Sequence, residues 1–124
     1  MSTQRGILES FGFAVAGIRE AIQNEPNFKI HLGIAVLTLV LAYFLKFTIL
    51  EWLLLTSVIS FVLVLELVNT SLEAIVDLVS PEIRVKAKLA KDVAAASVLI
   101  ASTFATAAGI LLFLPKILNL VLGF

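Results

Sequence analysis

Hydrophobic and polar positions follow two different patterns along this chain. In residues 5–23, apolar side chains recur every three or four residues, while Glu9, Arg19 and Glu20 fall on the opposite face. This period predicts an amphipathic helix. Because the chain has no soluble core against which this helix could pack, we expect it to lie in the membrane interface. Packing against another helix is the alternative.

Beyond residue 23 the apolar positions merge into long segments. Asn24-Glu25-Pro26 indicates a new helix start, and Trp52 lies where an interfacial anchor is common. About 20 apolar residues are needed to cross a bilayer as a helix. The predicted spans are residues 27–47, 49–79 and 93–118, with a basic connector at 80–92. The sequence therefore predicts an all-α integral membrane protein, a single membrane domain over residues 1–124 with one interfacial helix and three transmembrane helices.

Composition supports a lipid environment. The chain has 124 residues, of which 60% are hydrophobic and 15% charged, and its mean hydropathy is +1.10. Nine basic and nine acidic side chains cancel, so no charge excess favours a nucleic-acid partner. Cysteine is absent, which excludes disulfides and thiol chemistry. So short a chain cannot enclose a large site, and we expect neighbouring subunits to complete it.

The distribution of basic residues predicts the orientation in the membrane. Basic residues are concentrated before the first span and before the third; they are Arg5, Arg19 and Lys29, then Arg84, Lys86, Lys88 and Lys91. The opposite ends carry only Lys46 and Lys116. Since positive loops stay in the cytoplasm, the N-terminus is expected inside the cell and the second span should emerge on the cytoplasmic side.

The emerging half of the second span carries a polar stripe. Glu66, Asn69, Glu73 and Asp77 stand at offsets of 0, 3, 7 and 11 residues. At 100° per residue they occupy an arc of about 80° on one helix face. The stripe rises about 16 Å, so it connects a lipid phase at Glu66 with water at Asp77.

This stripe is the candidate for chemistry. Lys91 and Asp92 precede the third span and Glu25 precedes the first, all on the predicted cytoplasmic side, so the three helix ends should converge. Carboxylate and amide oxygens suit Mg²⁺, which proteins often hold together with substrate phosphates. A deep Glu66 could accept a proton from a lipid alcohol, so phosphoryl transfer fits.

Two other interpretations of the polar stripe remain. The carboxylates could form only interhelical hydrogen bonds and ion pairs, with Lys91 neutralising an acid. An ion or proton pathway is another option, although the other spans lack a second deep acid. His31 is expected to pack or titrate and not to bind metal, because no second histidine exists. The sequence contains none of the familiar nucleotide-binding loops.

The pattern E-x-x-N-x-x-x-E-x-x-x-D from Glu66 to Asp77, followed by Lys91-Asp92, resembles the signature of the prokaryotic diacylglycerol kinase family. This family includes the undecaprenol kinases. The resemblance covers nearly the whole chain. It implies a small homotrimeric membrane enzyme with three spans per subunit, which uses MgATP and shares each active site between subunits.

The resemblance also implies roles for individual residues. Glu66 matches the general base, and Asn69 and Asp92 match further catalytic positions. Glu25 and Glu73 match metal ligands. ATP would contact Glu73, Asp77, Lys91 and Asp92. Arg5 is displaced by about one residue from an N-terminal arginine found in part of the family.

The resulting prediction is an ATP- and Mg²⁺-dependent kinase that phosphorylates diacylglycerol or undecaprenol. Its predicted location is the inner (plasma) membrane of a prokaryote, with the N-terminus in the cytoplasm. Its partners would be the lipid alcohol, the bilayer and two further copies of the chain, and no nucleic acid. The alternative is a non-catalytic membrane scaffold or an ion- or proton-conducting subunit.

Overall fold

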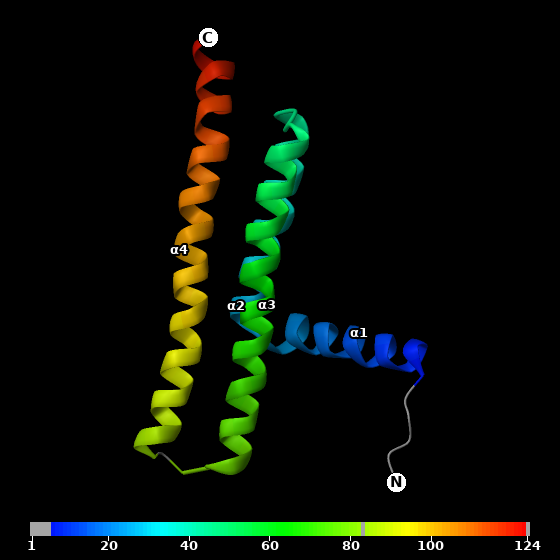
Figure 1. The fold of residues 1–124 in the computed structure, drawn as a ribbon, viewed down its shortest axis with the longest axis vertical. Helices are drawn as coiled ribbons and strands as arrows, with labels where there is room; N and C mark the ends of the chain where they lie inside the picture. The colour runs from blue at the N-terminus through cyan, green and yellow to red at the C-terminus, as the bar shows by residue number, and fades with distance from the viewer. Residues whose placement is uncertain (1–5, 83, 124) are drawn as a thin grey trace.

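The computed structural model describes residues 6–82 and 84–123, so Arg5 lies outside the described residues. Over these residues the chain forms four helices, α1 (Ile7–Asn24), α2 (Pro26–Phe44), α3 (Ile49–Val79) and α4 (Val85–Leu122) (Figure 1). The last three are long and apolar enough to cross a membrane. The predicted all-α fold with three spans is confirmed.

Short sequence signals account for two of the helix junctions. Pro26 occupies the first turn of α2 and Glu25 is its N-cap residue, while Asn24 belongs to the end of α1. A capping box starts α3: Thr48 N donates to Glu51 Oε2 at 2.8 Å, and Glu51 N donates to Thr48 Oγ1 at 3.3 Å. Each junction is therefore tight, which fixes where neighbouring helices begin.

The helix that contains the third predicted span begins before that span does. α4 starts at Val85, so most of the predicted connector at 80–92 is helical, and α4 continues to Leu122. Alanine, leucine and lysine, which dominate residues 86–91, are strong helix formers. Lys88 also forms an ion pair with Asp92 one turn later. Charge ends the apolar span here, but it does not end the helix.

The four helices are arranged as a bundle with one lateral arm (Figure 1). α4 lies along α3, and α2 packs against α3 as well. α1 points sideways from the bundle and contacts α2 and α3 near the start of α2. This orientation suits a helix in the interface plane, since Ile7, Leu8 and Phe11 are exposed. The end of α3 and the start of α4 extend beyond the level of α1 (Figure 1).

A small cluster closes the opposite end of the bundle. Ala42, Phe47, Leu55 and Phe113 are buried together there. Lys116 Nζ lies 3.0 Å from Glu51 Oε2 and 5.4 Å from the centroid of the Phe47 ring. Elsewhere most large apolar side chains are exposed, as expected for surfaces that face lipid or further copies of the chain.

Candidate active site

The polar stripe of α3 runs from a buried end to an exposed end. Glu66 and Asn69 are buried, with 2% and 8% of their surface exposed. Glu73 is half-buried and Asp77 is exposed. Because α3 continues past the level of α1 (Figure 1), the stripe passes from inside the bundle to its open end. The exposure of the stripe therefore rises from Glu66 to Asp77, in the direction in which the spacing predicted a passage from lipid to water.

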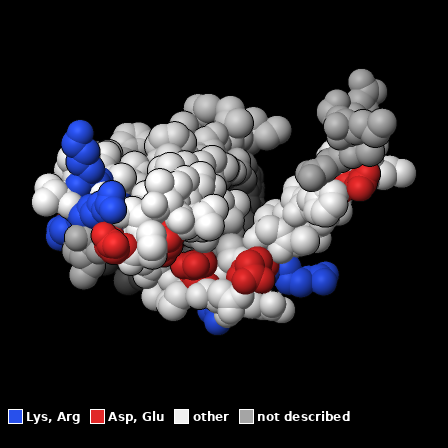
Figure 2. All heavy atoms as spheres, turned by 90° about the horizontal axis from the view of Figure 1, so that it is seen from below, with Lys and Arg blue, Asp and Glu red and all other residues white. Residues whose placement is uncertain are grey.

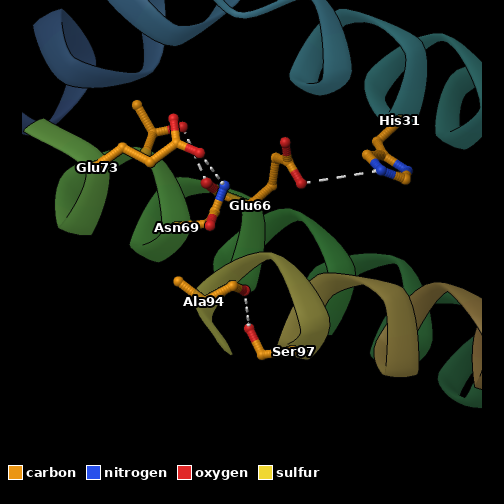
Figure 3. A network of polar contacts seen from close by, with 7 residues as sticks. His31, Glu66, Asn69, Glu73, Ala94 and Ser97 are labelled. Atoms are coloured by element: carbon orange, nitrogen blue, oxygen red, sulfur yellow. Dashed lines mark hydrogen bonds and ion pairs between the residues drawn. The ribbon is translucent and has the colours of Figure 1, made fainter. Parts of the chain in front are cut away.

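Glu66 lies opposite His31 of α2. Glu66 Oε2 is 3.9 Å from His31 Nε2, and the His31 side chain is 25% exposed against 3% for Glu66 (Figure 3). The Glu66 carboxylate also interacts electrostatically with Glu73 and Glu25. A buried carboxylate in a span is costly and usually marks a functional site. The structure therefore places the Glu66 carboxylate within electrostatic range of Glu73 and Glu25, with His31 beside it.

Asn69 has a buried side-chain oxygen that points away from Glu73 (Figure 3). Its Nδ2 donates to Glu73 Oε1 at 3.3 Å (Figure 3), while its Oδ1 is buried with no hydrogen-bond partner among the described residues. Buried polar atoms normally have a partner. Carboxylate oxygens such as those of Glu66, Glu73 and Glu25 are the kind of ligand that Mg²⁺ prefers. In the described part of the chain no three acidic or histidine side chains are close enough to hold a metal alone.

At the open end, α3 and α4 are joined by an ion pair. Lys91 Nζ donates to Asp77 Oδ1 across the connector. Asp92, in contrast, pairs with Lys88 on its own helix and its side chain is 58% exposed. The chain thus brings Lys91 to the stripe, while the ion pair of Asp92 is with Lys88. Figure 2 shows acidic side chains close together across this end of the bundle, with basic side chains beside them.

An apolar groove opens between α2, α3 and α4. Its volume is about 560 Å³, and His31, Thr38, Val62, Ser102 and Gly109 are among its lining residues. Ser102 Oγ is buried without a hydrogen-bond partner among the described residues. Sequence reasoning missed this groove. Its sequence signal was the small residues at spacings of three and four on α4, Ser102, Ala105 and Gly109.

The fold and the site together define the class of protein. This is a small α-helical membrane protein with buried carboxylate and amide groups at one end of its spans, next to an apolar groove. The family model for prokaryotic diacylglycerol kinase matches residues 12–113. The chain therefore belongs to the prokaryotic diacylglycerol kinase family, and it is a membrane lipid kinase of a prokaryote.

Individual relatives carry two different names. The chain is 36% identical to the undecaprenol kinase of Bacillus subtilis (strain 168) over 109 residues, which cover 88% of this chain and 89% of the relative. It is 42% identical to a diacylglycerol kinase of Synechocystis sp. over 118 residues, 93% of this chain but 66% of the longer relative. Identity to the diacylglycerol kinase of Escherichia coli (strain K12) is 35% over 96 residues, 77% of this chain and 78% of that protein.

Proposed function

We propose that this chain transfers the γ-phosphoryl group of ATP to the primary hydroxyl of a membrane lipid, diacylglycerol or undecaprenol. The reaction would take place at the cytoplasmic face of the inner membrane. One observation carries the proposal: on a single face of α3, polar groups change from the buried Glu66 to the exposed Asp77. Such a stripe lets an alcohol from the bilayer meet a nucleotide from water.

The buried end of the stripe suits proton acceptance. Glu66 would take the proton of the lipid hydroxyl, and the alkoxide oxygen would attack the γ-phosphorus. The bond from phosphorus to the β,γ-bridging oxygen breaks, and ADP leaves with the electron pair. The apolar groove that ends at His31, 3.9 Å from Glu66, supports entry of a lipid chain from the bilayer.

The exposed end of the stripe suits phosphate binding. Lys91 would exchange its ion pair with Asp77 for the phosphates of ATP, which offer a higher negative charge. Glu25 and Glu73 would hold Mg²⁺, and the electrostatic contact of both carboxylates with Glu66 supports this assignment. A bound Mg²⁺ supplies electrostatic stabilisation of the transferring group.

We further propose a homotrimer with the N-terminus in the cytoplasm. Exposed apolar side chains of α3 such as Leu54, Phe61 and Val64 support contact with further copies. The Asp92 side chain is 58% exposed, so it is accessible to the site of a neighbouring subunit. The basic residues near the start of α2 and of α4 support the orientation.

The experiment is a phosphoryl-transfer assay on the purified full chain. The protein in mixed micelles receives ATP labelled at the γ-phosphorus, with Mg²⁺ or with a chelator, and either diacylglycerol or undecaprenol. We expect the label to appear in one of the two lipids, and only when Mg²⁺ is present. The Glu73→Gln variant should transfer no label. Transfer to neither lipid would refute the proposal. Ion flux through vesicles that carry the chain, without ATP consumption, would favour the conducting-subunit alternative.

A further inference from the structure

We propose that His31 is a positioning residue of this site. Its side chain holds the Glu66 carboxylate and the incoming lipid hydroxyl in the correct relative position. The inference rests on the proposed function, because it assigns a role within the same reaction. Neither the sequence pattern nor the names of the relatives assign this histidine a role. It is the single histidine of the chain.

The first observation is the contact with Glu66. Among the described residues, His31 is the basic side chain within 4 Å of the Glu66 carboxylate, with 3.9 Å between Nε2 and Oε2. Two other charged side chains, those of Glu73 and Glu25, act on Glu66 electrostatically, and both are acidic. They repel the Glu66 carboxylate, whereas an imidazole N–H can donate to it. Among the described residues, His31 therefore supplies the attractive contact that can restrain the orientation of this buried group.

The second observation is the location of His31 between the groove and Glu66. His31 is 25% exposed and lines the groove, while Glu66 is 3% exposed and is not part of its lining. Along α2 the groove runs from His31 to Leu41, so His31 forms its end nearest the acids. Figure 3 shows the imidazole and the Glu66 carboxylate facing each other between α2 and α3. A hydroxyl that arrives along the groove therefore meets His31 before Glu66.

Together these observations define what His31 does. Its imidazole closes the polar end of an otherwise apolar groove and restrains the oxygen that accepts the proton. A reacting group displaced by 1 Å can lose about 100-fold in rate. Loss of this contact should therefore lower kcat. The KM for ATP should stay unchanged, because Asp77 and Lys91, the residues proposed to contact ATP, lie at the open end of the bundle.

The test compares two unbranched replacements of similar length. His31→Gln keeps an N–H donor, and His31→Met removes it, while both residues favour helices. We expect His31→Met to lower kcat for lipid phosphorylation about 10- to 100-fold, with the KM for ATP within about twofold of the wild type. His31→Gln should recover most of this loss. Tyr43→Phe, at the far end of α2 and 72% exposed, is the control that keeps wild-type rates.

The outcomes separate this inference from the proposed function. A wild-type chain that phosphorylates no lipid refutes the proposed function itself. If the wild type is active, an unchanged kcat in His31→Met overturns the role of His31 alone. Equal losses in the Gln and Met variants, or a loss that appears mainly in the KM for ATP, overturn it as well. Thermal unfolding of each variant in the same micelles identifies a rate loss that comes from misfolding, which would also count against a positioning role.

Discussion

Replacing Glu66 with glutamine isolates the chemistry of the buried carboxylate from its shape. Glutamine has the same size and keeps one oxygen, but it cannot accept a proton at neutral pH. General-base catalysis contributes about 10²- to 10⁴-fold to a rate. The variant should therefore lose about 3–5 kcal/mol of transition-state stabilisation, at about 1.4 kcal/mol per factor of ten.

The same substitution should leave folding intact. The Glu66 side chain is 3% exposed, and its closest basic partner among the described residues is His31 at 3.9 Å, longer than a hydrogen bond. A charged side chain at depth in a span costs about 2.5 kcal/mol or more. Glutamine removes the cost of burying a charge, and its remaining side-chain oxygen can keep the contact with His31. The free energy of unfolding should therefore stay constant or rise, although activity falls.

Two measurements on one preparation decide this prediction. Initial rates of lipid phosphorylation at saturating ATP give kcat, and thermal unfolding in the same micelles gives stability. We expect a rate at least 100-fold below the wild type together with an unfolding midpoint that is equal or higher. A variant that keeps more than about a tenth of the wild-type kcat would show that Glu66 is not the base. An inactive variant that is also unfolded would show that Glu66 is needed for structure.

Three further perturbations address other parts of the molecule. Lys91→Met should lower kcat/KM for ATP about 10- to 100-fold, because a charge-assisted contact with phosphate is worth about 1.5–3 kcal/mol; steady-state kinetics with varied ATP measure it. Lys116→Met and Glu51→Gln should destabilise the double mutant by less than the sum of the single effects in a double-mutant cycle of unfolding free energies, since Lys116 Nζ lies 3.0 Å from Glu51 Oε2. Ala42→Leu should lower the unfolding free energy by about 1–3 kcal/mol through overpacking, because Ala42 is fully buried.

Matched controls define the results that would contradict these predictions. For Lys91 the control is Lys86→Met, which removes a charge from an exposed position on the same helix. Equal effects of both changes on kcat/KM would exclude a specific phosphate contact. For Ala42, the exposed Val40→Leu adds one carbon towards lipid and should be neutral. A coupling energy of zero between Lys116 and Glu51 would mean that their ion pair contributes no stability.

Periodicity within one helix was predictable because helix geometry is nearly constant. The offsets between Glu66 and Asp77 set their shared face before any packing was known. The gradual exposure along the stripe follows from its length and its place at the end of a span. Helix limits were less predictable where charge and helix propensity disagree. The basic residues from Lys86 to Lys91 indicated a connector, but they are strong helix formers and continue α4 toward its start.

The sequence by itself determined the lipid environment, the number of spans and the face on which the acids of α3 lie, since each depends on composition or on spacing within one helix. The tertiary structure decided which side chains of different helices meet. It placed His31 against Glu66, joined Lys91 to Asp77 and opened the groove between α2, α3 and α4. These contacts depend on the relative rotation and axial offset of packed helices. Many side chains along each interface fix these quantities together, so no spacing within one helix reveals them.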